Sequence, residues 1–145
     1  MMRSTIRWMR AVLWILAAMY LVNGVAMFFF PSAWFFHLIL GVPETGPYNM
    51  HLVMDSGTFF LGVGVGLIAG AIAPRRNAIA VLIAAVASTM HAALHLWSHA
   101  EGLLSWSAAT TEIFGIYIPT LLLLAIAIAL YRPDAPAAAR AARAA

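Results

Sequence analysis

The chain has 145 residues, of which 64% are hydrophobic and only 9% are charged. A soluble domain carries about 25% charged residues, so this composition excludes a soluble globular protein and predicts an integral membrane protein. The absence of cysteine excludes disulfides, thiolate metal sites and cysteine nucleophiles. The net charge of +3 comes from arginines scattered between apolar runs, and this pattern excludes the basic face that nucleic acid would require.

Four apolar runs have about the 20 residues that a helix needs to cross a bilayer. They cover residues 11–30, 50–73, 78–97 and 108–131. We therefore expect an all-α, four-helix up-down bundle that forms one membrane domain over residues 1–136. The Arg/Ala-rich residues 137–145 are expected to be a disordered cytoplasmic tail.

A short aromatic segment follows the first run. Pro31 ends the first helix, and residues 32–40 (SAWFFHLIL) are apolar but too short to span a membrane. We expect a brief helix along the membrane interface here, in which His37 is an interfacial residue. Residues 41–47 are rich in turn formers and cannot continue that helix.

The basic residues predict the orientation of the bundle. All eight are arginines, and they lie before the first run, between the second and third runs, and after the fourth. A chain with four spans places these three regions on the same side of the membrane. Because positively charged segments stay in the cytoplasm, both termini are expected there. The membrane itself is expected to be the bacterial cytoplasmic membrane.

The second run opens with two polar side chains one helical turn apart. His51 and Asp55 share a helix face, and Gly62 and Gly66 continue this face toward the other end of the run. Small residues allow another helix to approach closely. We therefore expect this face to lie inside the bundle, and we predict that Gly66→Leu would weaken its packing.

The third run ends in the segment MHAALHLWSHAE, residues 90–101. A spacing of four places His91, His95 and His99 on one helix face. Glu112 lies in the first turn of the fourth run at a similar depth, and Pro119 is expected to kink that helix. Polar side chains within a span usually face the bundle interior and mark a functional site, so we expect a polar cluster just below the outer surface.

Three interpretations of this cluster stay open, and the first is the one we favour. The first is a transition-metal site for Zn, Fe or Cu, with redox or hydrolytic chemistry. Its ligands would be His51, Asp55, His91, His95 and Glu112. Glu112 could instead orient a ligating imidazole. The second interpretation is a metal-free proton relay or small-molecule pocket, with haem as a less favoured variant. The third is a non-enzymatic structural subunit of a homo-oligomer or larger membrane complex. The sequence decides neither enzymatic activity nor a role for His37 and His99.

Two motifs resemble known proteins. Residues 46–57 (GPYNMHLVMDSG), followed by residues 91–95 (HAALH), resemble a group of small bacterial four-helix integral membrane proteins. The layout is also loosely similar to that of the DoxX-like membrane proteins. The resemblance implies a four-helix membrane fold, and its motifs contain four of the five candidate ligands. It implies no activity, because a fold does not by itself specify one.

Overall fold

The computed structural model describes residues 2–132, and every regular element in that range is helical. The longer elements are α1 (Met2–Phe29), α3 (Met50–Ile72), α4 (Ala78–Ala100) and α6 (Ile118–Tyr131). The short elements are α2 (Pro31–Ala33), the π-helix η1 (Trp34–Leu38), the 3-10 helix η2 (Val42–Thr45), α5 (Ala109–Glu112) and the π-helix η3 (Ile113–Tyr117). The predicted tail, residues 137–145, lies outside the described range.

Four helical stretches are long and apolar enough to cross a membrane. They are Thr5–Phe29, Met50–Ile72, Ala78–Ala100 and Ala109–Tyr131. The predicted all-α fold with four apolar spans is therefore confirmed. The first span begins at Thr5, well before the apolar run at residue 11, because the helix continues through the basic N-terminal segment.

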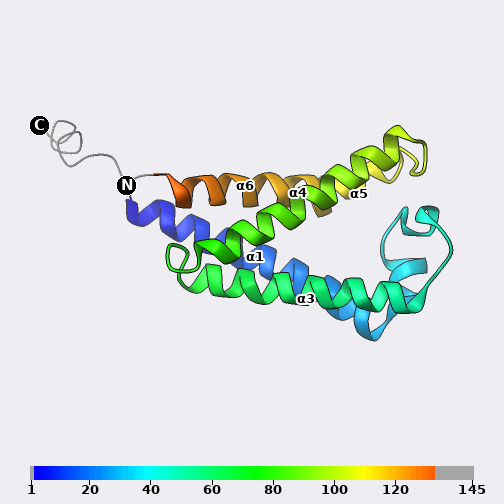
Figure 1. Ribbon diagram of the computed structural model, residues 1–145, viewed down its shortest axis with the longest axis horizontal. Coiled ribbons are helices and arrows are strands. Elements are labelled where there is room, and N and C mark those ends of the chain that lie inside the picture. Colours follow the sequence, from blue (N-terminus) through cyan, green and yellow to red (C-terminus); the bar gives the residue numbers. More distant parts are fainter. Residues whose placement is uncertain (1, 133–145) are drawn as a thin grey trace, which may run out of the picture.

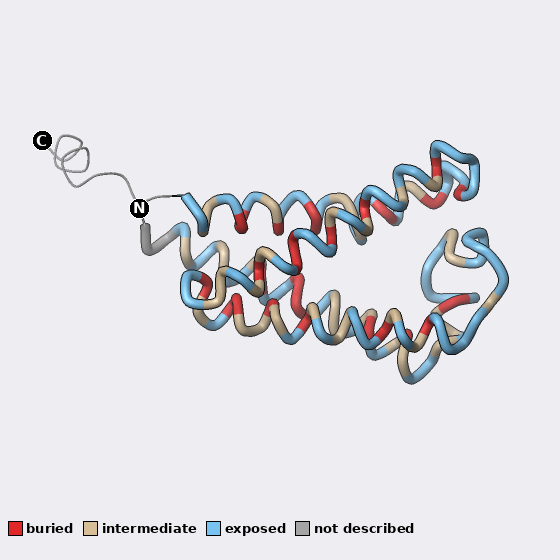
Figure 2. The backbone as a smooth tube through the Cα atoms, viewed as in Figure 1, coloured by how far each residue is buried: buried red, intermediate tan, exposed pale blue. Residues whose placement is uncertain are grey.

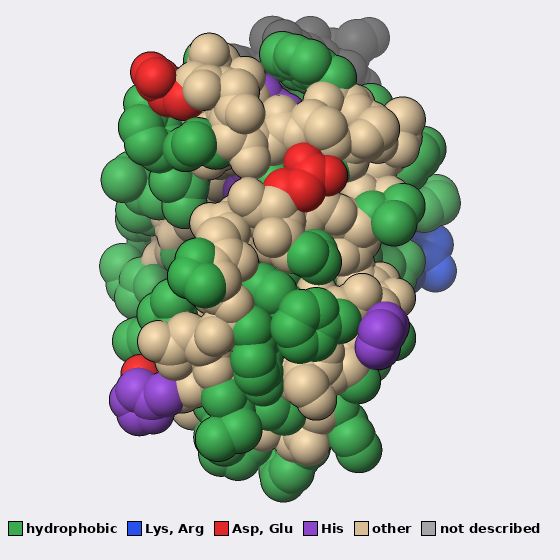
Figure 3. Space-filling model, turned by 90° about the vertical axis from the view of Figure 1, so that its right-hand side faces the viewer, with side chains coloured by type: hydrophobic (Ala, Val, Ile, Leu, Met, Phe, Trp, Pro, Cys, Tyr) green, Lys and Arg blue, Asp and Glu red, His purple; other side chains and the backbone are tan. Residues whose placement is uncertain are grey.

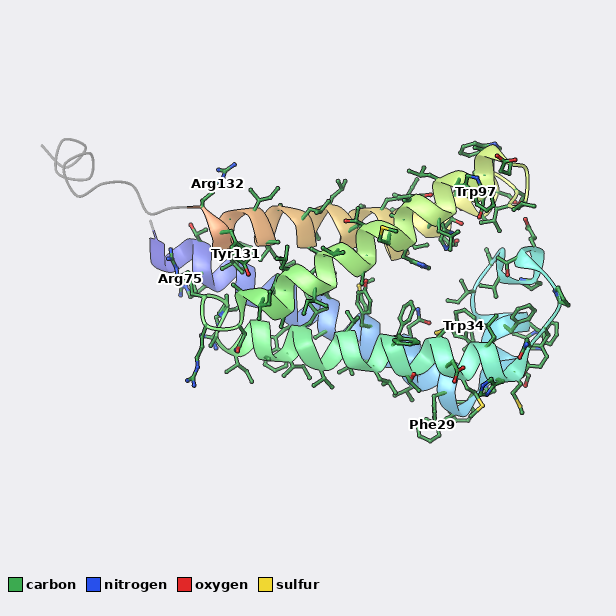
Figure 4. All side chains as sticks on the ribbon, viewed as in Figure 1. Phe29, Trp34, Arg75, Trp97, Tyr131 and Arg132 are labelled. Atoms are coloured by element: carbon green, nitrogen blue, oxygen red, sulfur yellow. The ribbon has the colours of Figure 1, made fainter. Side chains whose placement is uncertain are left out.

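The four spans alternate in direction and form two pairs (Figure 1). In one pair α1 and α3 pack along their lengths, and in the other α4 packs against α6. The pairs meet at the end that holds the α3–α4 turn, and they spread apart toward the other end (Figure 1). Arg75 and Arg132 lie at the first end, which we call the arginine end (Figure 4). We call the opposite end, which holds the connections 30–49 and 101–108, the loop end.

An apolar core joins the two pairs toward the arginine end. Membrane helices associate through close packing, because lipid tails are as apolar as the side chains. Small side chains on α3 and α4 let bulky leucines from α1 and α6 fit between them, and the buried positions follow one stripe of each helix (Figure 2). The buried members are Leu13, Leu16, Ala17, Leu67, Ala71, Val81, Ala84, Ala85, Leu123, Ile126 and Ala127.

Two glycines make the closest contact between α1 and α3. A Cβ atom added to Gly24 would lie 2.9 Å from the carbonyl oxygen of Gly57. A Cβ atom added to Gly57 would lie 3.0 Å from the carbonyl oxygen of Gly24. Both neighbouring atoms belong to the backbone, so no side-chain rotation could make room. Glycine at both positions is what allows the two helices to cross at this distance.

The sequence predicted that Gly62 and Gly66 form the closely packed face of α3, and this prediction is wrong for contacts within the chain. A Cβ atom added to Gly62 would meet no atom within 4 Å, and one added to Gly66 would meet Ala80 Cβ at 3.8 Å. The reason is that α1 packs on the side of α3 that carries Gly57. Gly66→Leu is therefore not expected to disturb the packing of the chain.

The two long connections at the loop end touch each other. The Glu44 carboxylate, in η2, accepts hydrogen bonds from the backbone N–H of Ser105 at 2.7 Å and from its hydroxyl at 3.0 Å. Gly41 has a left-handed φ of 85° and lies against Ala108, where an added Cβ would be 2.6 Å from the alanine Cβ. The predicted short helix after the first span is present as α2 and η1, and it ends before this turn.

Candidate functional site

Glu112 lies at the centre of a polar cluster at the loop end. His95 Nδ1 is 2.9 Å from Glu112 Oε1, and His99 Nε2 is 2.7 Å from Glu112 Oε2. The two histidines are four residues apart on α4, so they approach the carboxylate from one helix face. Each carboxylate oxygen thus has its own imidazole, and the carboxylate is held in a fixed plane between α4 and the fourth span.

The fourth span positions a further partner through its irregular start. The Tyr117 hydroxyl donates to Glu112 Oε2 at 3.2 Å. The segment between them is the π-helix η3, in which hydrogen bonds span five residues instead of four. This winding brings the fifth residue after Glu112 back over it. Pro119 follows immediately and lacks the N–H that a regular helix would use, which fits the predicted distortion of this span.

The contacts of His99 limit the protonation states of the His99–Glu112 pair. His99 Nδ1 lies 3.2 Å from the carbonyl oxygen of Leu104. A carbonyl oxygen only accepts hydrogen bonds, so this Nδ1 must carry hydrogen. If His99 Nε2 also carries hydrogen, His99 is an imidazolium facing an ionised Glu112. If it does not, Glu112 is the protonated partner. In either state the pair holds one proton that can shift between Nε2 and Oε2.

Burial makes this pair tightly constrained. The side chains of His99 and Glu112 are 1% and 7% exposed, whereas His95 is 20% exposed. The Trp106 ring stacks on the His99 ring with centroids 4.7 Å apart. Within residues 5–132, every buried side-chain nitrogen and oxygen has a hydrogen-bond partner. A buried charged pair is tolerated only when its remaining donors and acceptors are satisfied in this way.

His91 extends the cluster away from the loop end. Its ring meets the His95 ring edge to face, with centroids 4.6 Å apart. On its other side it contacts Phe60 of α3, at 6.1 Å between centroids. Because His95 Nδ1 faces Glu112, the other nitrogen, Nε2, is the one that can exchange a proton or bind a ligand. His95 therefore links the buried pair to His91, which is half-buried.

The predicted residues of α3 lie elsewhere. His51 Nε2 is 3.2 Å from Asp55 Oδ2, and these side chains are 86% and 54% exposed. They belong to the α1–α3 pair, which spreads away from α4 at the loop end (Figure 1). Figure 3 looks onto this end and shows histidine side chains at its periphery. In the part of the chain that the structure describes, no group of three or more His, Asp or Glu side chains could hold a metal ion.

The structure adds two residues to the cluster that the sequence had not assigned. The sequence left the role of His99 undecided, yet it is the most deeply buried histidine of the cluster. Its spacing of four from His95 was the available signal. Tyr117 had no such signal, because the π-helix that brings it to Glu112 is invisible in a pattern based on 3.6 residues per turn.

Known proteins give no guide to this site. No family model, curated protein or solved structure matches the chain. The resemblance to small bacterial four-helix and DoxX-like membrane proteins therefore stays an expectation. The chemistry of the cluster has to be argued from its geometry.

The buried polar side chains end about halfway along the bundle. Below the cluster, the hydroxyls of Ser88 and Thr120 lie 2.7 Å apart, and Thr120 Oγ1 also donates to the Ser88 carbonyl at 3.2 Å. Among the described residues, the buried polar or charged side chains are Ser88, His99, Glu112 and Thr120. The apolar core lies between them and the arginine end. The apolar core therefore separates the cluster from the arginine end.

We expect Thr120→Val to destabilise the protein only slightly. The substitution keeps the shape but removes the hydrogen bonds to Ser88, and such bonds between membrane helices contribute about 0.6 kcal/mol on average. The measurement is the free energy of unfolding in bicelles, with the exposed Thr110→Val as the control. A loss above about 2 kcal/mol would contradict this reading, because it exceeds the largest such bond.

Proposed function

We propose that the chain is a multi-pass protein of the bacterial cytoplasmic membrane with both termini in the cytoplasm. The support is the distribution of arginines together with an even number of spans. Arg75 and Arg132 lie at one end of the bundle, whereas Trp34 and Trp97 lie toward the other (Figure 4). Tryptophans favour a membrane interface. The loop end, with its polar cluster, would then face the periplasm.

We further propose that the cluster is a metal-free acid–base site, in which His95 exchanges a proton with a small molecule at the periplasmic side. One observation carries this proposal: His95 Nδ1 lies 2.9 Å from one oxygen of Glu112, while the other oxygen is held by His99. A carboxylate that fixes the Nδ1–H form leaves a lone pair on Nε2, which is the arrangement of a general base.

The same geometry argues against a path for protons across the membrane. A relay needs a continuous series of groups that can pass a proton on. The series His91, His95, Glu112 and His99 lies in the loop-end half of the bundle. Toward the arginine end the spans are joined by the apolar core. The function that fits is local proton transfer at one membrane surface.

The test is the protonation state of His95. In protein labelled with ¹⁵N-histidine and embedded in nanodiscs, we expect NMR to find hydrogen on Nδ1 of neutral His95 in the wild type. In Glu112→Ala this preference should be lost, while His51 keeps its wild-type spectrum. The spectra are recorded from pH about 5 to about 8, where histidines change charge. If His95 carries hydrogen on Nε2 in the wild type, the proposal is overturned.

Metal binding is the second candidate, and one observation favours it. A histidine that ligates a metal almost always donates its other ring nitrogen to a carboxylate or carbonyl, and His95 is placed in this way by Glu112. His91 and His95 would supply two ligands, with Glu112 as support and the remaining ligands from solvent or substrate. The predicted Zn, Fe or Cu thus stays a proposal that involves fewer residues than the sequence indicated.

Metal analysis separates the two candidates. Protein purified without chelators is assayed for bound metal and for an absorption spectrum, alongside His91→Ala and His95→Ala. Stoichiometric metal that is lost in both variants would favour the second candidate, and a Soret band would favour the less favoured haem. A metal-free protein, with the His95 tautomer described above, supports the acid–base site. If His95 shows neither property, the cluster is a structural feature of a non-enzymatic subunit.

A further inference from the structure

Asp55 lies at a position where an isolated carboxylate is unfavourable. It is five residues beyond Met50, the first residue of α3, which is about 7.5 Å along the helix axis. Its side chain is 54% exposed, and its partner His51 is 86% exposed. Ionisable side chains within a span are almost always turned toward protein or a water-filled cavity. This face of α3 is therefore expected to be covered in the membrane.

A groove continues from this pair toward the arginine end. It runs between α3 and α4 and has a volume of about 350 Å³. Its floor is formed by small residues, because Gly62 and Gly66 come from α3 and Ala80 and Ala84 from α4. The bulky Phe59 stands at its edge and is 74% exposed. One face of the protein thus carries both a cavity and a large side chain that could fill a cavity.

We propose that this face binds a second copy of the chain in the same membrane orientation. A two-fold symmetric interface uses the same patch on both copies, so the patch must complement itself. His51 and Asp55 meet this condition, because the histidine of each copy can pair with the aspartate of the other. Phe59 and the glycine groove meet it as well, since each phenylalanine can enter the opposite groove.

Self-complementarity also decides between a second copy and another partner. A different membrane helix with a basic side chain would need Asp55 alone, and it would gain nothing from a histidine beside that carboxylate. The small-residue groove alone would fit many helices. The identical chain can use the donor, the acceptor, the protruding ring and the groove together. The interface involves none of the residues around Glu112, so this proposal does not depend on the proposed acid–base site.

Disulfide crosslinking tests the surface directly, because the chain has no cysteine of its own. Gly62→Cys is placed where an added side chain has open space. Leu121→Cys is the control, since it is 65% exposed on α6. In vesicles of phosphatidylethanolamine and phosphatidylglycerol, we expect oxidation to link Gly62→Cys into dimers and to leave Leu121→Cys monomeric. Equal crosslinking at the two positions, or a monomeric Gly62→Cys protein, would overturn the proposal.

A charge exchange tests the predicted pairing across the interface. We expect His51→Asp and Asp55→His each to weaken dimerisation about tenfold, because each variant removes both symmetric hydrogen bonds of the dimer. When the two variants are mixed, each aspartate again faces a histidine of the other copy, so mixed dimers should form with wild-type affinity. Fluorescence energy transfer between differently labelled copies measures this. Mixed dimers as weak as those of either variant alone would overturn the two-fold pairing.

Discussion

Replacing Glu112 with leucine is expected to destabilise the protein by about 4 kcal/mol, the typical effect of removing one partner of a buried ion pair. The substitution removes the acceptor of His95, His99 and Tyr117 together. His99 is the least able to adapt, because its side chain is 1% exposed and its Nδ1 is committed to the Leu104 carbonyl. Its Nε2 would then be buried without a partner. The measurement is the free energy of unfolding in bicelles.

Glu112→Gln should lower the free energy of unfolding much less, by about 1 kcal/mol, the size of one ordinary hydrogen bond. The glutamine oxygen can still accept from His95 Nδ1, and its amide group can donate to Nε2 of a neutral His99. Only the bond from Tyr117 has no acceptor in this arrangement. Glu101→Leu serves as the matched control, because Glu101 is exposed in the neighbouring connection. If the leucine and glutamine variants unfold alike, the cluster does not contribute through its hydrogen bonds.

The sequence was sufficient to predict the number of spans and most of their limits. Hydrophobicity and length determine which segments can cross a bilayer, and residues 50–73 and 108–131 match the spans Met50–Ile72 and Ala109–Tyr131 closely. Part of the polar cluster could also be predicted, since a spacing of four places His91 and His95 on one face. These features depend only on local periodicity.

What the sequence could not specify is how the helices are rotated and spread. His51 and Asp55 were predicted to meet the α4 histidines because both pairs lie at a similar depth, but depth does not determine direction. The Gly24–Gly57 contact turns α3 toward α1, so the Asp55 side chain remains 54% exposed. A helix that carries small residues on two faces can pack closely through either face, and the tertiary packing determines which face is used.

Gly57→Leu is the second large effect that we expect, a loss of about 3 kcal/mol or more in the free energy of unfolding. A Cβ atom at this position would lie 3.0 Å from the Gly24 carbonyl oxygen and 3.1 Å from the backbone nitrogen of Phe28. Neither atom can move unless α1 moves with it. The larger leucine would therefore force α1 and α3 apart along their whole contact.

The matched control is Gly62→Leu, one and a half turns further along the same helix. Nothing lies within 4 Å of a Cβ atom added there, and leucine favours a helix more than glycine by up to about 1 kcal/mol. At protein concentrations where the chain is monomeric, Gly62→Leu should unfold like the wild type or slightly later. If Gly62→Leu were the more damaging of the two, α3 would have to present its Gly62 face to α1, and the exposed position of His51 and Asp55 would be lost with it.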